Sequence, residues 1–352
     1  MLGARTLRQT ELDEGKMKAN HLSLVIGITM FLMSFTAFAD HPTVVFGINV
    51  AGPINTISAS TLPAGTFTLG LQTEVIDNDE FNTDQLEGFA ADGLEGVHTL
   101  DSITNTSISA SYGVTDDLSV TARLPNITRK NIREGELEGG IPEAHTHGDS
   151  SGFGDLLIMG QYSITKNDSS SISVNVGVKA PTGETHEKDN DGVRFETEFQ
   201  PGSGSWDFLL GIAVSKTSGV FGYYANILYN KTTEGSQSTE IGTTLSYNAA
   251  VAYRLNSESN HHEDHHNTDH AHSDTRLDLI LELNGDKRNK DKISGVSEEH
   301  SGGNTILISP GIKVSSSDFG GFMSFGIPVV KNQNGTQSDI GKRIVAGVSV
   351  SF

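Results

Sequence analysis

Histidine and carboxylate side chains are concentrated in residues 260–274, which read NHHEDHHNTDHAHSD. Six of the chain's 13 histidines lie there: His261, His262, His265, His266, His270 and His272. Imidazole is the commonest protein ligand for transition metals, and carboxylates add oxygen ligands. The tract therefore predicts a segment that binds Zn²⁺, Cu²⁺ or Ni²⁺. A solvated low-complexity turn fits the same composition. We expect no cofactor that the protein requires.

Two short patterns formally match catalytic motifs. Residues 262–266 (HEDHH) have the H-E-x-x-H spacing of zinc proteases, but that motif needs an amphipathic helix, and this stretch has no apolar face. Residues 148–152 (GDSSG) have the G-x-S-x-G spacing, but the strand and helix that flank a nucleophile elbow are missing from the pattern. We therefore expect no enzymatic activity.

Four further histidines are scattered among carboxylates in the expected external loops. His145 and His147 are the closest pair, followed by the isolated His186 and His300. Scattered histidines with acidic neighbours are typical of ordinary polar loops. We interpret these residues in that way, with the pair at 145 and 147 as the best candidate for a metal among them.

The composition excludes several classes of protein. With 24 Lys and Arg against 44 Asp and Glu, the formal charge is −20, so no nucleic-acid partner is expected. The chain has no cysteine, which removes disulfides, cysteine-based metal sites and thiol catalysis. A protein with several transmembrane helices is excluded too, because only one apolar run approaches the required length of about 20 residues.

Residues 1–39 have the pattern of a cleaved secretory signal peptide. Lys16 and Lys18 precede an apolar stretch at 22–35, and small residues at 37–39 come before the expected cleavage site. Met17 begins a more ordinary signal peptide than Met1 does, so residues 1–16 are an over-extended start or a short leader. The pattern predicts export from the cytoplasm.

From residue 65 onward, apolar and polar residues alternate with the period of a β-strand. About twelve segments show the pattern. They are 65–77, 101–113, 117–127, 151–165, 171–181, 204–216, 220–232, 240–254, 275–285, 303–314, 319–330 and 340–352. Their usual length, about 10–13 residues, suits a strand that crosses a bilayer better than an ordinary globular strand.

The connections alternate between long (78–100, 128–150, 182–203, 286–302) and short, as external loops and periplasmic turns do. The sequence therefore predicts an all-β fold: a transmembrane antiparallel up-and-down β-barrel of about 12 strands in the outer membrane, over residues 65–352. A soluble β-sandwich is the alternative.

Two segments have expected places relative to this barrel. Residues 40–64 are interpreted as a periplasmic lead-in segment, with the lumen as a second possible place, where the segment would reduce conductance. If the first strand starts in the periplasm, the link at 255–274 also falls on the periplasmic side. The His-rich tract is then an unusually long periplasmic turn within the barrel.

Charged residues alternate with the apolar ones at strand positions. They are Glu74, Arg123, Asp155, Lys179, Asp207, Arg254, Arg276, Asp278, Glu282, Lys313 and Arg343. We expect this set to line a wet lumen and to set its selectivity, either as mutually paired networks or along an aqueous path. About twelve strands lie between the eight that side chains fill and the sixteen that leave a channel, so a narrow pore is possible.

Phe352 closes the last alternating segment. It resembles the C-terminal signature by which bacterial outer-membrane barrels are recognised for assembly. The barrel-assembly machinery and outer-membrane lipid are therefore expected partners.

Four motifs rich in glycine, proline and serine carry a further resemblance. They are 52–63 (GPINTISASTLP), 152–156 (GFGDL), 180–183 (APTG) and 201–207 (PGSGSWD). They resemble the outer-membrane transporter family grouped with the "meta-pathway of phenol degradation" proteins. The resemblance implies a barrel of the twelve-strand type and a transporter, without naming its solute.

Two functions follow as hypotheses. The first is a monomeric channel for passive passage of a small solute of unknown identity. The alternative is a metal-handling outer-membrane protein, in which the His-rich segment binds Zn, Cu or Ni and the barrel is its anchor or conduit. A structural or enzymatic barrel without transport ranks last.

Overall fold

The computed structural model describes residues 52–94, 97–255, 275–316 and 318–352. The expected signal peptide, residues 40–51 and the His-rich tract at 260–274 lie outside this part of the chain. Within it, no helix combines the length and the apolar character that a membrane span needs.

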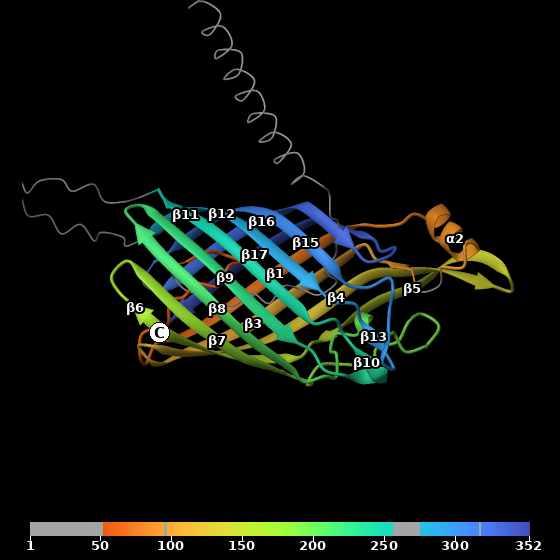
Figure 1. Cartoon of the computed structure of the whole chain (residues 1–352), viewed down its shortest axis with the longest axis horizontal. Coiled ribbons are helices and arrows are strands. Elements are labelled where there is room, and N and C mark those ends of the chain that lie inside the picture. The colour runs from red at the N-terminus through yellow and green to blue at the C-terminus, as the bar shows by residue number, and fades with distance from the viewer. Residues whose placement is uncertain (1–51, 95–96, 256–274, 317) are drawn as a thin grey trace, which may run out of the picture. The chain divides into compact units, whose positions relative to one another are not determined.

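Twelve antiparallel strands close into a β-barrel (Figure 1), as the sequence predicted. In chain order they are β1 (Phe67–Asp79), β3 (Ser102–Thr115), β4 (Leu118–Glu138), β6 (Leu156–Lys166), β7 (Ser170–Ala180), β8 (Asp207–Ser218), β9 (Phe221–Lys231), β11 (Thr244–Arg254), β12 (Arg276–Arg288), β15 (Gly303–Ser315), β16 (Phe319–Gln333) and β17 (Asp339–Ser351). Pairing of β1 with β17 closes the barrel. Closure leaves no unpaired sheet edge, as a strand structure in a bilayer requires.

Phe352 extends this closing seam by one residue. Its backbone N–H donates to the Phe67 carbonyl at 2.8 Å, and the Phe67 N–H donates back at 3.1 Å. The two rings stack with centroids 6.5 Å apart, and Phe352 is exposed. Its role as an assembly signal stays a prediction.

The expected loop at 128–150 is wrong, because β4 continues to Glu138 and returns as β5 (Ile141–Phe153). Gly139 and Gly140 form the turn with φ of 60° and 87°, values that suit glycine in a tight hairpin. The hairpin projects beyond the barrel (Figure 1), and it moves the start of the next barrel strand from the expected residue 151 to Leu156.

The other long connections also contain regular structure. They hold α2 (Thr83–Ala91), β2 (His98–Thr99), η1 (Thr197–Phe199) and η2 (Ser236–Ser238), and a small sheet of β10 (Thr239–Glu240), β13 (Lys292–Ile293) and β14 (Val296–Ser297). α2 begins with a capping box between Asn82 and Gln85. α2, β5, β10 and β13 gather at one end of the barrel in Figure 1, which we call the long-loop end. The opposite end is the short-turn end.

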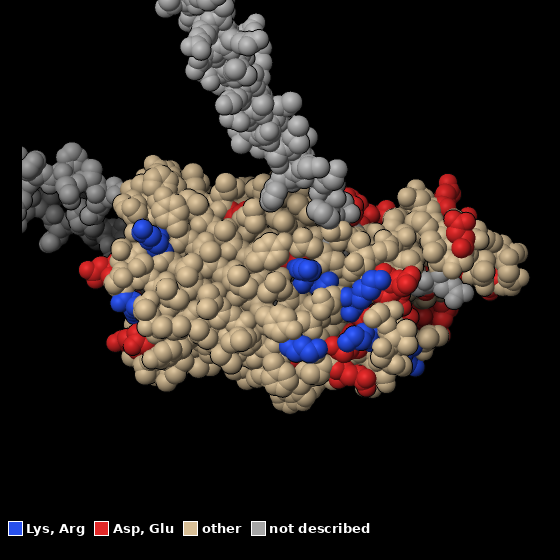
Figure 2. All heavy atoms as spheres, in the orientation of Figure 1, with Lys and Arg blue, Asp and Glu red and all other residues tan. Residues whose placement is uncertain are grey.

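The two faces of each strand differ as a membrane barrel requires. In β12, Leu279, Leu281 and Leu283 are exposed, whereas Ile280 and Glu282 between them are buried. On the face shown in Figure 2, charged side chains gather toward the two ends, and the broad band between them is almost free of charge. This outward apolar surface faces the hydrocarbon.

Replacing Leu281 by Arg puts a guanidinium into this band. Leu281 is 56% exposed near the middle of β12. We expect Leu281→Arg to lower the free energy of unfolding in lipid vesicles by about 2–4 kcal/mol, measured by urea titration. Val193→Arg is the matched control, because Val193 is 62% exposed outside the strands. Equal effects of the two substitutions would contradict the lipid-facing assignment.

Candidate functional site in the barrel interior

Residues 52–62, here called the interior segment, run through the inside of the barrel. The Glu282 carboxylate accepts hydrogen bonds from the backbone N–H groups of residues 54–56 at 2.8–3.1 Å. Farther along, Ile57 N–H donates to Asn226 Oδ1 at 2.8 Å, and Leu62 N–H donates to Ser119 Oγ at 2.7 Å. Inward polar side chains therefore satisfy the backbone of a segment that has no strand neighbour.

The side chains of the interior segment occupy the lumen from the middle of the barrel toward the short-turn end. Ile57 and Ala59 belong to one buried apolar cluster, with Leu157, Met159, Leu209, Ala213 and Leu228. Ile54 belongs to another, with Ala252, Ile280 and Val345. The expected lead-in segment thus lies inside the barrel from Gly52 onward, in the second of its two predicted places. Apolar packing occupies this part of the lumen.

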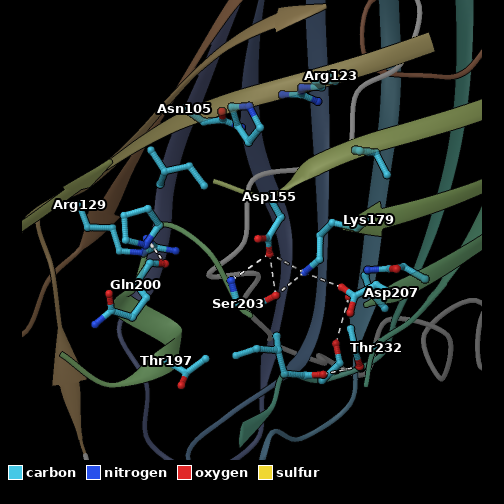
Figure 3. A pocket seen from close by; sticks show the side chains of 18 residues that line it. Asn105, Arg123, Arg129, Asp155, Lys179, Thr197, Gln200, Ser203, Asp207 and Thr232 are labelled. Carbon is cyan, nitrogen blue, oxygen red and sulfur yellow. Dashed lines mark hydrogen bonds and ion pairs between the residues drawn. The ribbon is translucent and has the colours of Figure 1, made fainter. Parts of the chain in front are cut away.

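A cavity of about 150 Å³ lies on the long-loop side of the interior segment. Positions along β4 show the order: Ser119 holds the segment, whereas Ile127 and Arg129, nearer the long-loop end, line the cavity. Its apolar lining comes from Pro125, Ile127, Leu157, Pro201 and Ile241. The polar residues Asn105 and Gln200 also line the cavity (Figure 3).

One wall of the cavity is an ionic network centred on Lys179 (Figure 3). The Lys179 ammonium lies 2.6 Å from the Asp207 carboxylate and 3.3 Å from that of Asp155. Asp155 also accepts from the backbone N–H of Gly183 at 2.9 Å and from the N–H and Oγ of Ser203 at 2.9 and 2.7 Å. Both carboxylates are buried. Paired and hydrogen-bonded in this way, buried charges are tolerated.

Three of the four motifs that carry the family resemblance meet around Asp155. A Cβ added to Gly183 would lie 2.7 Å from backbone atoms of both Gly154 and Gly202. The three glycines therefore allow the segments 152–156, 180–183 and 201–207 to pack backbone against backbone, where any larger residue would separate them.

The connection between β7 and β8 covers the cavity at the long-loop end. Arg129 Nη1 donates to the carbonyls of Phe199 and Gln200 at 3.3 and 3.1 Å, and Ser150 Oγ donates to the Phe199 carbonyl at 2.6 Å. Thr197, Gln200 and Pro201 of this connection line the cavity. Ser150 belongs to strand β5, so the G-x-S-x-G pattern is part of a hairpin and forms no nucleophile elbow.

The other predicted interior charges are placed as follows. Glu74 and Arg343 are buried, with Arg343 Nε 3.5 Å from Glu74 Oε1. Arg254 Nε lies 3.3 Å from Asp278 Oδ1. Lys313 Nζ donates to the Gly52 carbonyl at 3.1 Å, and Arg123 Nη2 donates to Ser107 Oγ at 2.8 Å. The Glu74–Arg343 and Arg254–Asp278 contacts pair opposite charges, while those of Lys313 and Arg123 named here are to uncharged oxygens. The role of this set in selectivity stays a prediction.

Arg276 is the exception in the predicted set. It is exposed at the start of β12, at the short-turn end, although it shares the inward parity of Asp278. Arg129, in contrast, was not predicted. It continues the inward alternation of Arg123, but the expected strand stopped at residue 127. Ser119 and Asn226, which hold the interior segment, carry no charge, so the pattern of charged residues at strand positions did not identify them.

Removing the cation of the network should destabilise the barrel. Lys179→Met leaves the buried Asp155 and Asp207 facing each other without a counterion, and we expect a loss of about 3 kcal/mol in the free energy of unfolding. The double variant Lys179→Met/Asp207→Asn should recover part of the loss, because Asp155 keeps its hydrogen bonds to Gly183 and Ser203. A double variant no more stable than the single one would contradict the network.

Comparisons with known proteins agree with this architecture. Residues 95–317 match the family described as "Putative MetA-pathway of phenol degradation". An outer membrane channel from Pseudomonas putida F1 has a TM-score of 0.55 at 14% identity, covering 84% of this chain and 98% of its own. LpxR from Salmonella typhimurium has a TM-score of 0.42 at 12% identity, covering 80% of this chain and 99% of its own.

No curated protein sequence matches the chain. The Pseudomonas channel shows the fold, and the family match covers well over half of the residues. The resemblance seen in the sequence is thereby confirmed: the chain belongs to the MetA-pathway of phenol degradation family and is a β-barrel of the cell outer membrane.

Proposed function

We propose that the protein is a channel for passive passage of a small solute about the size of one aromatic ring. The observation that carries this proposal is the cavity of about 150 Å³ inside the barrel. An apolar protein cavity of roughly this volume can hold benzene. The family's description, which names phenol degradation, supports a solute with an aromatic ring.

The lining of the cavity suits a solute that is apolar on its faces and polar at one edge. Pro125, Ile127 and Leu157 offer apolar contact, while the side-chain amide of Asn105 offers a hydrogen bond. Among the charged side chains of the lining, three are cationic and two anionic: Arg123, Arg129 and Lys179, against Asp155 and Asp207. The slight cationic excess favours a neutral or weakly anionic solute over a cation.

The interior segment makes this a restricted channel. It occupies the lumen on the short-turn side of the cavity, so a solute can cross the barrel only if the segment moves aside. Among the side chains that hold it, Glu282 makes the most hydrogen bonds, because it binds three successive backbone N–H groups and Asn55 Nδ2. Loss of this carboxylate would release residues 54–56 locally without unfolding the barrel.

Metal handling is the second function that the sequence suggests. Its histidines, at 261–272, lie outside the described residues, and the role stays a prediction. So do the monomeric state and insertion by the assembly machinery.

A larger side chain in the cavity lining should block passage of the solute. Leu157→Trp places an indole in the lining, whereas Ile158→Trp, one residue away, places it on the lipid-facing surface, where Ile158 is 40% exposed. In liposomes loaded with benzoate, which crosses lipid slowly as an anion, we expect Leu157→Trp to abolish most of the protein-dependent efflux. Ile158→Trp should leave it unchanged. Equal efflux from both variants would refute passage through this cavity.

The lumen should open when Glu282 is removed. Glu282→Ala leaves three buried N–H groups without their acceptor, at a cost of about 1–3 kcal/mol each, so the interior segment should leave its place. We expect a higher single-channel conductance in planar bilayers. Glu240→Ala is the control, because Glu240 pairs with Lys231 and Lys292 at the long-loop end, away from the segment. An unchanged conductance would show that the segment does not restrict the pore.

A further inference from the structure

Two histidines and a glutamate from three separate elements meet beyond the long-loop end of the barrel. His98 comes from β2, Glu134 from the extension of β4, and His147 from β5. His98 Nε2 lies 3.0 Å from Glu134 Oε2, and His147 Nε2 lies 3.4 Å from the same oxygen. One ligand atom from each of the three residues lies within 4.8 Å of the others. Strand pairing creates the juxtaposition, because β4 lies between β2 and β5.

These distances match the geometry of a bound transition-metal ion. Zinc binds histidine nitrogen and carboxylate oxygen at about 2.0–2.2 Å in a tetrahedron, so its ligand atoms lie about 3.3–3.6 Å from one another. The measured 3.0 and 3.4 Å are close to such edges. Two imidazoles with one carboxylate also form a donor set used by catalytic zinc sites.

The surroundings support this donor set. The side chains of His98, Glu134 and His147 are 11%, 19% and 19% exposed, and the Phe199 ring lies against His98 with centroids 4.9 Å apart. Glu196 Oε2 lies 4.0 Å from His98 Nε2 and is within reach as a fourth ligand. The cluster is therefore partly shielded from water yet open on one side, which lets an ion enter.

His147 is held by a second carboxylate, as metal-bound histidines commonly are. Its Nδ1 lies 3.4 Å from Asp189 Oδ2. Asp189 Oδ1 in turn accepts from the backbone N–H groups of Asp191 and Val193 at 3.0 and 2.8 Å. This arrangement orients the imidazole so that Nε2 points at Glu134.

We propose that His98, Glu134 and His147 form a Zn²⁺ site, with Asp189 as the residue that orients His147. The site shares no residue with the His-rich tract and goes beyond the proposed channel function. A bound ion would join β2, in the connection between β1 and β3, to the β4–β5 hairpin. The connection between β7 and β8, part of which covers the cavity, reaches the site through Asp189 and Glu196.

Without an ion, His98 and Glu134 favour their charged forms. Burial lowers the pKa of His98, but its hydrogen bond to Glu134 and the charges of Glu134, Glu196 and Glu198 outweigh burial and raise that pKa to about 9. Burial likewise raises the pKa of Glu134, yet the hydrogen bonds from His147 and His98 hold it well below its usual range. Zinc would displace the proton on His98, as is general for histidine ligands.

The test uses the full mature chain, refolded without a histidine tag. The six tract histidines are replaced by glutamine so that they do not compete, and Zn²⁺ is titrated against a chromophoric chelator. We expect one tight site per chain. His147→Gln and His98→Gln should each weaken it by about 100-fold or more, and Asp189→Asn by about 10-fold. His186→Gln, an exposed histidine outside the cluster, should leave the affinity unchanged.

A measurement on the unsubstituted cluster keeps the proposal testable if a variant misfolds. Co²⁺ added in place of Zn²⁺ should give the intense visible absorption of a tetrahedral site, and Zn²⁺ should abolish it. Absence of a tight site, or equal affinity in folded His147→Gln, would overturn the proposal and leave the cluster as a proton-bridged network. Folding of each variant is checked by its heat-dependent migration on gels.

Discussion

Hydrocarbon offers no partner to a backbone N–H or C=O, and the rest of this structure depends on that constraint. It forces the twelve strands to close into a barrel. Closure creates an interior whose space must be filled and whose polar groups need hydrogen-bond partners. The interior segment meets this need from within the chain. Its apolar side chains pack against inward apolar residues. Its backbone N–H groups donate hydrogen bonds to inward carboxylate, amide and hydroxyl oxygens.

The same constraint explains how charges are distributed inside. A packed interior has a low dielectric, so each ionised group needs a close partner. Lys179 bridges Asp155 and Asp207, and Arg254 lies beside Asp278. Charges that serve to hold parts of the fold together are less free to select ions. The cavity lining, with its apolar wall and few exposed charges, is the better candidate for selecting a solute.

The sequence predicted the barrel well, because period-two alternation records the one physical difference that every strand shares, lipid outside and protein inside. It predicted the long connections poorly. The alternation in β4 runs on past the membrane, and Gly139-Gly140 reverses the chain far from the bilayer, where apolar residues no longer mark the outward face. The interior segment also escaped a firm prediction, since a lone extended segment without strand partners has no periodicity of its own. His98 could not be singled out, because its partners at 134 and 147 are distant in sequence and meet only through the pairing of β2, β4 and β5.

The place of the interior segment has a consequence for assembly. The segment leads directly into β1, and β1 also forms the closing seam with β17, from the opposite end of the barrel sequence. Its anchors, Ser119, Asn226 and Glu282, are spread over β4, β9 and β12. Threading such a segment through a finished barrel would require these anchors to form last, whereas enclosing it while the sheet is open avoids that step. Pairing of the first and last strands, which have the highest sequence separation in the fold, would then trap it. In that order of events the segment would serve as an internal template, around which the sheet curls before it closes.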